Sequence, residues 1–198
     1  SACTNSVVQS PSDLRAILKQ SCVPIDQGLP AKEMDFQNSL EECSDLVPGS
    51  LIEGGSNTAL NVGWEAKNRS KGLVWFHGDV PVMISVQAGI PIALNDVMAT
   101  YGSPEHYSVI NAGTAECHLL ITLMYESMGS NYVVELPCNE QSSFSDRAKI
   151  SLIELYTPYK YMETIRFLYS MSDGDVAREQ TFISSWKGIE HVRNTSGK

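Results

Sequence analysis

The stretch from Gly89 to Cys138 constrains the fold most, because its pattern predicts a helix and then two strands. Four apolar residues at positions i, i+3, i+4 and i+7 form the stripe of an amphipathic helix: Leu94, Val97, Met98 and Tyr101. Residues 102–104 read Gly-Ser-Pro, which is typical of a helix end, since glycine caps a helix and proline cannot continue it. We therefore expect a helix over residues 94–101.

Two extended, mostly apolar segments come later in this stretch, at His118–Glu126 and Tyr132–Leu136. The residues between them read Ser-Met-Gly-Ser-Asn, a gap rich in turn formers and of hairpin length. The stretch therefore predicts a helix that leads into an antiparallel sheet.

The cysteines give a second constraint. Cys3 stands apart near the beginning of the sequence, and the other four contain no Cys-x-x-Cys pair, which argues against a zinc knuckle or a thioredoxin motif. These four are Cys22, Cys43, Cys117 and Cys138. Three pairings of them are possible, but a hairpin between residues 118 and 136 would bring its flanking cysteines together. We expect a Cys117–Cys138 disulfide and, by elimination, a Cys22–Cys43 disulfide.

Each of these bonds would close a loop of about 20 residues and, on the chain-entropy model, stabilise the fold by about 3 kcal/mol. The alternative is four buried free thiols in a cytosolic protein. If the disulfides form, the compartment is oxidising and extracytoplasmic.

The first residues, Ser1-Ala2-Cys3, are similar to the end of a bacterial lipoprotein signal, in which the cysteine carries the lipid. We expect lipidation at Cys3 and a polar tether over residues 1–12. The alternative is a trimmed precursor with a spare thiol. No apolar run of membrane-spanning length occurs in the sequence, so membrane association would depend on this lipid anchor.

The segment before the central stretch has the same order of elements. Two strand-like runs, 72–76 and 80–86, follow the tripeptide Ala-Leu-Asn at residues 59–61, and this tripeptide recurs at residues 93–95. A tandem duplication and a chance similarity both account for this pattern.

We expect an α+β fold in which helices pack on one face of an antiparallel sheet, in two tandem halves. The halves would comprise residues 13–88 and 89–160. Residues 161–198 would form a C-terminal helix and a tail that dock on this body.

Residues 94–105, which read LNDVMATYGSPE, resemble the helix-to-strand signature of small envelope lipoproteins. The chain is similar in this to the BamE-like lipoproteins and, through the tandem arrangement and the hairpin disulfide, to the beta-lactamase inhibitor protein. Trp186-Lys187-Gly188 resembles a motif late in uncharacterised lipoproteins of filamentous bacteria. The resemblance implies a binding or scaffolding role at the cell envelope, with no catalytic residues to carry over.

Charge and motif content argue against several classes of function. The formal net charge of -9 argues against nucleic acid and anionic membranes as partners, because both require a cationic surface. The sequence contains no zinc-hydrolase helix motif, serine-nucleophile motif or dinucleotide fingerprint. We therefore expect no enzymatic activity, cofactor or metal. The alternative is a secreted hydrolase or metal-binding protein that uses His77 and Asp79.

Aromatic residues concentrate near the C-terminus, where Tyr156, Tyr159, Tyr161 and Trp186 are candidates for partner binding. Tyrosine and tryptophan are favoured at interfaces because they combine apolar area with a polar tip. The alternative is that the tyrosines pack a helix onto the sheet. The expected function is that of a non-enzymatic extracytoplasmic lipoprotein, which binds a protein partner or serves as an accessory subunit of a membrane-associated envelope complex. Inhibition of a secreted enzyme is a further possibility.

Overall fold

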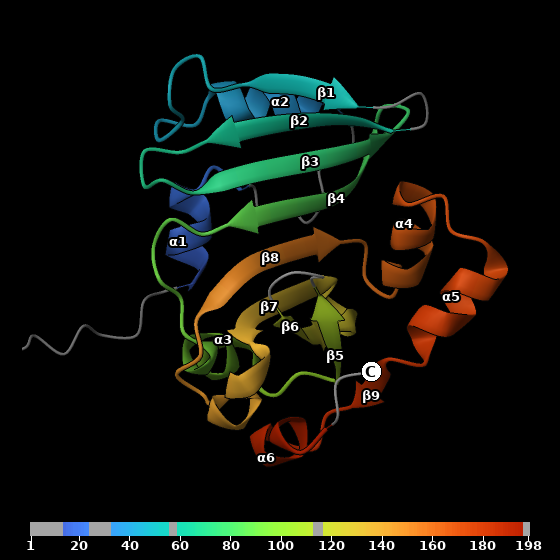
Figure 1. Cartoon of the computed structure of the whole chain (residues 1–198). Coiled ribbons are helices and arrows are strands. Elements are labelled where there is room, and N and C mark those ends of the chain that lie inside the picture. The colour runs from blue at the N-terminus through green and yellow to red at the C-terminus, as the bar shows by residue number, and fades with distance from the viewer. Residues whose placement is uncertain (1–13, 24–32, 56–58, 113–116, 196–198) are drawn as a thin grey trace, which may run out of the picture.

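The computed structural model describes residues 14–23, 33–55, 59–112 and 117–195, and its main element is one antiparallel sheet of nine strands (Figure 1). The strands are β1 (Ile52–Gly55), β2 (Leu60–Glu65), β3 (Lys71–His77), β4 (Val80–Gln87), β5 (His106–Ala112), β6 (His118–Tyr125), β7 (Ser130–Pro137), β8 (Ile150–Tyr156) and β9 (Ile183–Ser185). Their order across the sheet is β1-β2-β3-β4-β8-β7-β6-β5-β9.

Six α-helices and two short 3-10 helices accompany this sheet in the described residues. They are α1 (Leu14–Gln20), α2 (Glu33–Glu41), α3 (Leu94–Tyr101), η1 (Glu126–Met128), η2 (Cys138–Ser143), α4 (Tyr161–Leu168), α5 (Asp173–Gln180) and α6 (Ile189–Arg193). The helix predicted over residues 94–101 and the hairpin of β6 and β7 are confirmed.

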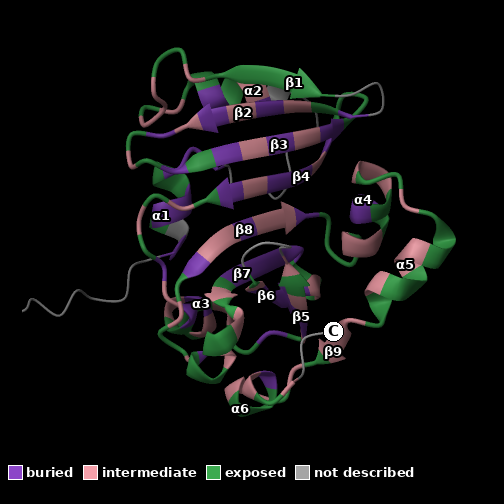
Figure 2. Ribbon diagram, in the orientation of Figure 1, coloured by how far each residue is buried: buried purple, intermediate pink, exposed green. Residues whose placement is uncertain are grey.

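The strands form because apolar residues alternate with polar or small ones. In β3, Gly72, Val74 and Phe76 are buried, whereas Leu73 and Trp75 between them are half-buried. Successive side chains on a strand point to opposite faces, so this alternation separates two faces of the sheet. Figure 2 shows the same alternation of buried and half-buried residues along β2–β4.

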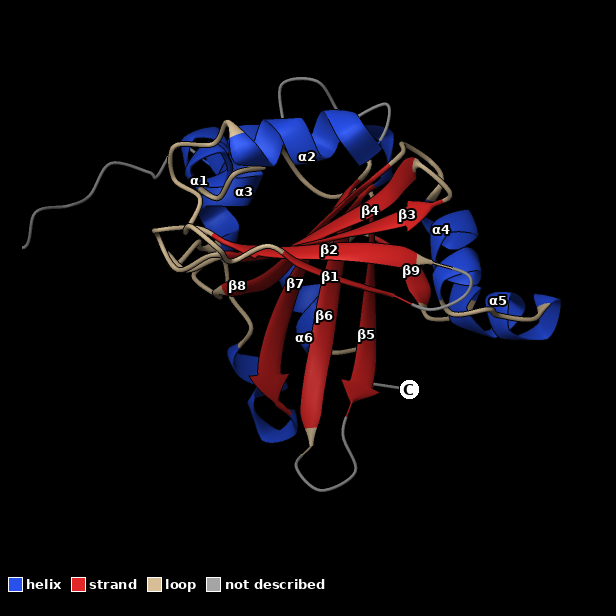
Figure 3. Ribbon diagram, turned by 90° about the horizontal axis from the view of Figure 1, so that it is seen from above, coloured by secondary structure: helices blue, strands red, loops and turns tan. Residues whose placement is uncertain are grey.

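We call one side of the sheet the back face. It carries Val62, Trp64, Val74, Phe76, Ile84, Val86, Tyr107, Ile121 and Tyr132, all buried. Buried residues of α1, α2, α3 and α6 share one apolar core with these residues. In Figure 3, α1, α2 and α3 lie together on one side of β1–β4, while β5–β7 run across the direction of those strands. The opposite side, with Leu73 and Trp75, is the front face.

The predicted fold class, an α+β fold with helices on one face and two tandem halves, is wrong. Strand β4 pairs with β8 from Met83↔Tyr156 to Val86↔Ile153, so a single sheet runs through both expected halves. Helices also lie on both faces, because α4 and α5 enclose a small cavity with front-face residues of β5 and β6. The physical reason is that an exposed strand edge leaves backbone N–H and C=O groups unpaired, and the β4–β8 pairing removes two such edges.

Both predicted disulfides are confirmed. Cys22–Cys43 joins the end of α1 to the end of α2, and Cys117–Cys138 joins β6 to β7 at the ends opposite their turn, with Cα–Cα distances of 5.7 and 5.3 Å. These bonds indicate an oxidising, extracytoplasmic environment. Cys3, the expected lipidation site, lies outside the described residues.

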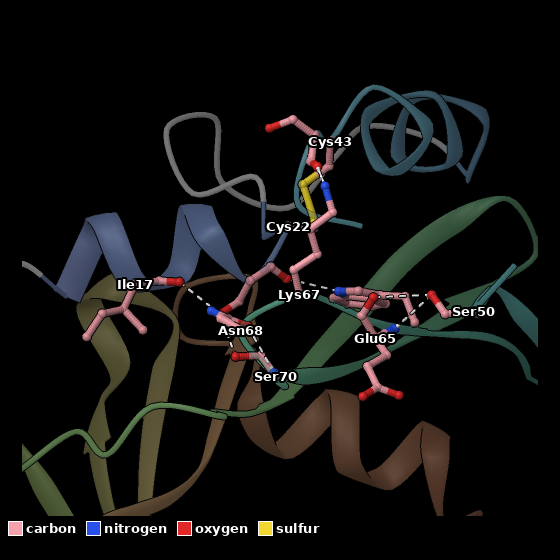
Figure 4. The surroundings of a disulfide bond; sticks show 11 residues. Ile17, Cys22, Cys43, Ser50, Glu65, Lys67, Asn68 and Ser70 are labelled. Atoms are coloured by element: carbon pink, nitrogen blue, oxygen red, sulfur yellow. Dashed lines mark hydrogen bonds between the residues drawn. A yellow bond between two sulfur atoms is a disulfide. The ribbon is translucent and has the colours of Figure 1, made fainter. Parts of the chain in front are cut away.

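A buried polar cluster supports the first disulfide (Figure 4). Ser21 Oγ lies 2.8 Å from both the Ile17 carbonyl and Ser70 Oγ, and the Trp64 indole N–H donates to the Ser21 carbonyl over 3.0 Å. Burial of polar groups costs little folding free energy when they are hydrogen-bonded in this way. The cluster therefore holds the end of α1 on the back face beside Cys22.

Candidate functional site

The front face around Leu73 and Trp75 of β3 has no described helix above it. In Figure 1 the ribbons of β1–β4 lie in front of α1 and α2, and α4 and α5 lie beyond the ends of these strands. Leu73 and Trp75 are half-buried there, although they belong to an inner strand. Large apolar residues on an inner strand that lacks a covering layer are typical of a contact surface.

Strand register places the front-face residues in continuous rows. One row runs from Trp75 on β3 through Met83 on β4 to Tyr156 on β8. Residues directly opposite each other on neighbouring strands share a face and lie within contact distance. Met83 and Tyr156 are each only 2% exposed, so the uncovered surface around Trp75 ends where this row reaches β4.

The adjacent row runs from Gly63 through Leu73 and Ser85 to Glu154. A Cβ atom at Gly63 would lie 3.8 Å from Leu73 Cδ1 and 3.7 Å from the nearest backbone oxygen, an ordinary contact distance. The absence of a side chain at Gly63 thus leaves Leu73 uncovered. We use the name docking surface for Gly63, Leu73, Trp75 and Ser85.

The three predicted tyrosines lie close together but differ in exposure. Tyr156 is buried, with 2% of its surface exposed, and its hydroxyl donates to Asn131 Oδ1 over 2.9 Å. The ring of Tyr161 is half-buried, with its centroid 5.1 Å from that of Tyr156. Tyr159 is 71% exposed. Tyr156 therefore serves mainly to pack the fold, and Tyr159 is available for contact.

Trp186 lies away from these tyrosines. Its ring makes an edge-to-face contact with buried Tyr107, with 6.1 Å between centroids, and it packs against the core on the back face. The structure therefore does not bring Trp186 together with Tyr156, Tyr159 and Tyr161.

Glu154 and Tyr169 were not among the predicted site residues. Asn131 Nδ2 donates to Glu154 Oε2 over 3.0 Å, so Asn131 links this carboxylate to the Tyr156 hydroxyl. Burial raises the pKa of Glu154, and the hydrogen bond from Asn131 opposes this effect only in part. A single charged residue within the otherwise uncharged strand segment Ile150–Tyr156 is a signal that sequence reading could have used.

A cleft lies between α4 and α5. It has a volume of about 450 Å³ and is lined by Tyr161, Ile165, Tyr169, Ser170, Met171, Asp175, Arg178 and Glu179. We call it the α4–α5 cleft. On the other side of α4 a second hollow of about 460 Å³ is lined by Glu163, Arg166, Phe167, Ser170 and Met171.

The alternative site at His77 and Asp79 lies at the turn between β3 and β4. The His77 ring stacks on Phe167 of α4 with 4.2 Å between centroids, and both His77 and Asp79 are exposed. Within residues 14–23, 33–55, 59–112 and 117–195, no group of three histidine, cysteine or acidic side chains is arranged to hold a metal ion. His77 thus serves a packing contact that positions α4.

None of the helices in the described part of the chain is long and apolar enough to span a membrane. Comparisons of the chain with protein-family models, with curated proteins and with solved structures give no match.

Proposed function

We propose that this protein is a non-enzymatic, lipid-anchored binding protein of an oxidising extracytoplasmic compartment, and that a protein partner covers the docking surface. The main observation behind this proposal is that helices pack on the back face of β3, whereas no described helix packs on its front face. Helices bury Val74 and Phe76 on the back face completely, whereas Leu73 and Trp75 on the front face have no described helix above them.

Burial of the exposed parts of Leu73 and Trp75 would favour association. Full burial of a large apolar side chain contributes about 1.5–3 kcal/mol of free energy. Burial of the exposed half of Leu73 or of Trp75 by a partner would therefore contribute about 1 kcal/mol for each residue to the binding free energy. Exposed Tyr159 lies beyond the end of β8, past buried Tyr156, and offers a separate aromatic contact. A partner that spans these residues would meet aromatic anchors, which dominate binding energies in protein interfaces.

The lipid anchor at Cys3 would hold the protein at the membrane, where an accessory subunit of an envelope complex acts. Its test is the mass of the N-terminal peptide after the protein is purified from membranes. An acylated Cys3 supports the anchor, and an unmodified Cys3 thiol contradicts it.

Partner capture with a matched pair of variants tests the docking surface. Gly63→Lys adds a long charged side chain to the front face, at a position where a Cβ atom makes only ordinary contacts. Asn38→Lys adds the same charge at an exposed position on α2, on the back side of the molecule.

The native protein, bound to a resin through a C-terminal tag, should retain a defined protein from the membrane extract of its own organism. Gly63→Lys should lower that retention at least tenfold, and Asn38→Lys should leave it unchanged. Equal retention by all three proteins would show that the partner does not use the front face.

A further inference from the structure

The α4–α5 cleft has an aromatic wall. Tyr161, Ile165 and Tyr169 follow one another at intervals of four residues, so they lie along one side of α4 and its C-terminal cap. All three line the cleft toward α5. Tyr169 is 72% exposed, so its ring face is accessible to a ligand.

The turn between the two helices is well defined. Ser172 caps α5: its Oγ accepts a hydrogen bond from the Asp175 amide over 3.2 Å, and Asp175 Oδ2 accepts one from the Ser172 amide over 3.1 Å. Such reciprocal capping fixes where the helix begins. Local structure therefore sets the shape of the cleft at the end where the two helices meet.

The charges around the cleft leave an excess of negative charge. Arg178 Nη2 lies 3.1 Å from Asp175 Oδ1, so this pair is internally neutral. Glu179 lines the cleft as well, and within the described residues neither Glu179 nor Glu154 forms an ion pair. Glu179 therefore lines the cleft with Tyr161 and Tyr169 without an ion-pair partner among the described residues, whereas Glu154 lies outside the lining.

Glu154 and Glu179 act electrostatically on the tyrosines of the cleft. Burial raises the pKa of Tyr161 well above its ordinary value, and the charges of Glu154 and Glu179 raise it further. Partial burial of the hydroxyl, followed by the charge of Glu154, raises the pKa of Tyr169 although most of that residue is exposed. Both phenols therefore stay neutral, and the face of a neutral phenol ring attracts a cation.

We infer that the α4–α5 cleft binds a cationic side chain, lysine or arginine, of the partner protein. The ammonium or guanidinium group would lie against the ring of Tyr169 or Tyr161 and take Glu179, which lines the cleft, as its counter-ion. Cation–π contacts of this kind contribute about 0.5–2 kcal/mol, and more as water is excluded. The volume of about 450 Å³ suits an extended side chain rather than a single hydrated ion.

This inference rests on the proposed function, because it assigns the chemistry of one contact of the partner. The net charge of -9 supports it, since a strongly acidic protein attracts basic partners over long range. Arg178 does not fill the cleft in place of a partner's cation, because its guanidinium group pairs with Asp175 and the Arg178 side chain is 65% exposed.

Titration of the whole protein with small amides tests the cleft without the partner. The probes are N-acetyl-lysine methylamide, N-acetyl-arginine methylamide, the neutral N-acetyl-norleucine methylamide, and choline. Binding is followed by NMR amide shifts at low ionic strength. We expect the lysine and arginine probes to shift resonances of α4 and α5 and to bind at least tenfold more tightly than the norleucine probe.

Variants that each remove one negative charge locate the site. Glu179→Gln should lower the affinity for the lysine and arginine probes about three- to tenfold, and Glu154→Gln, whose carboxylate lies outside the lining, should lower it less. Glu42→Gln, at an exposed position just after α2, should leave the affinity for both probes unchanged. Amide spectra that match the native spectrum away from each substitution would show that the three variants retain the fold.

Three results would overturn the inference: equal affinity for the lysine and norleucine probes, no saturable binding of any probe up to about 50 mM, or tighter binding of choline than of the lysine probe. The last result would assign the cleft to a free quaternary ammonium compound. If no probe binds the cleft, the Gly63→Lys capture experiment can still support the docking surface. If Gly63→Lys does not lower capture, probe binding can still support the cleft. The two proposals therefore fail separately.

Discussion

The two faces of the sheet are built from the same strands but have different requirements. On β3, back-face Phe76 is fully buried beneath Phe36 of α2, whereas front-face Trp75 is only half-buried one residue earlier. The back face stabilises the fold through helix packing. The front face leaves part of the apolar surface of Leu73 and Trp75 exposed to solvent. Comparison of the two therefore separates residues that stabilise this protein from residues that are free to bind.

The largest contrast should come from truncating one aromatic residue on each side. Phe36→Ala empties a fully buried position between Trp64 and Phe76 and should lower the free energy of unfolding by about 3–5 kcal/mol. Trp75→Ala removes a half-buried ring and should cost about 1–2 kcal/mol. Urea denaturation with disulfides intact measures both values. Equal losses would mean that the front face is as important to folding as the back face.

A pair of glycines sharpens the comparison at the level of one methyl group. A Cβ atom at back-face Gly72 would lie 1.9 Å from the Trp64 ring, so Gly72→Ala should destabilise the protein by about 1–3 kcal/mol or more. Front-face Gly63→Ala should change stability by less than about 0.5 kcal/mol, since its nearest contact is 3.7 Å. Differential scanning calorimetry of both variants distinguishes the sites. A large loss at Gly63 would contradict an uncovered front face.

The smallest expected effect concerns pH. Because the pKa of folded Glu154 is raised above the ordinary value, the folded state binds this proton more tightly than the unfolded state. The contribution of Glu154 to stability therefore becomes less favourable as pH rises from the unfolded pKa of about 4.3 through the raised folded value. Glu154→Gln should remove this decline, so the stability of the variant relative to the native protein should improve between about pH 4 and pH 7.

Urea denaturation of the two proteins at both pH values tests this expectation. The amide oxygen that Glu154→Gln introduces can still accept the hydrogen bond from Asn131, so the comparison isolates the charge. A stability difference that stays constant with pH would show that Glu154 is not desolvated on the front face.

The elements that sequence reading predicted correctly are those whose signals are local. The apolar stripe of Leu94, Val97 and Met98, with Gly102 after it, predicts both ends of α3. The turn at residues 127–131 predicts the β6–β7 hairpin. The hairpin in turn brings Cys117 to Cys138. Four strands, β1, β2, β5 and β9, were not predicted, and the residues from Ala59 that open β2 were expected to begin a helix. Short segments such as Ile52–Gly55 and Ile183–Ser185 acquire strand structure only from a neighbouring strand.

The candidate site was less predictable than the fold. Tyrosine content pointed to residues 156–161, but it did not separate buried Tyr156 from exposed Tyr159. Glu154 and Glu179 come near Tyr161 through strand register and helix packing, which no local pattern encodes.

The sequence by itself determined α3, the β6–β7 hairpin and the two disulfides, because each depends on residues that are close along the chain or on elimination among few cysteines. Tertiary structure alone decided that β4 pairs with β8, that helices flank both sides of the sheet, and that Leu73 and Trp75 lack a cover among the described helices. Those outcomes depend on which strand edges and apolar faces meet across large sequence distances. Many pairings satisfy the same local pattern, and only their combined burial of surface and pairing of backbone groups selects one.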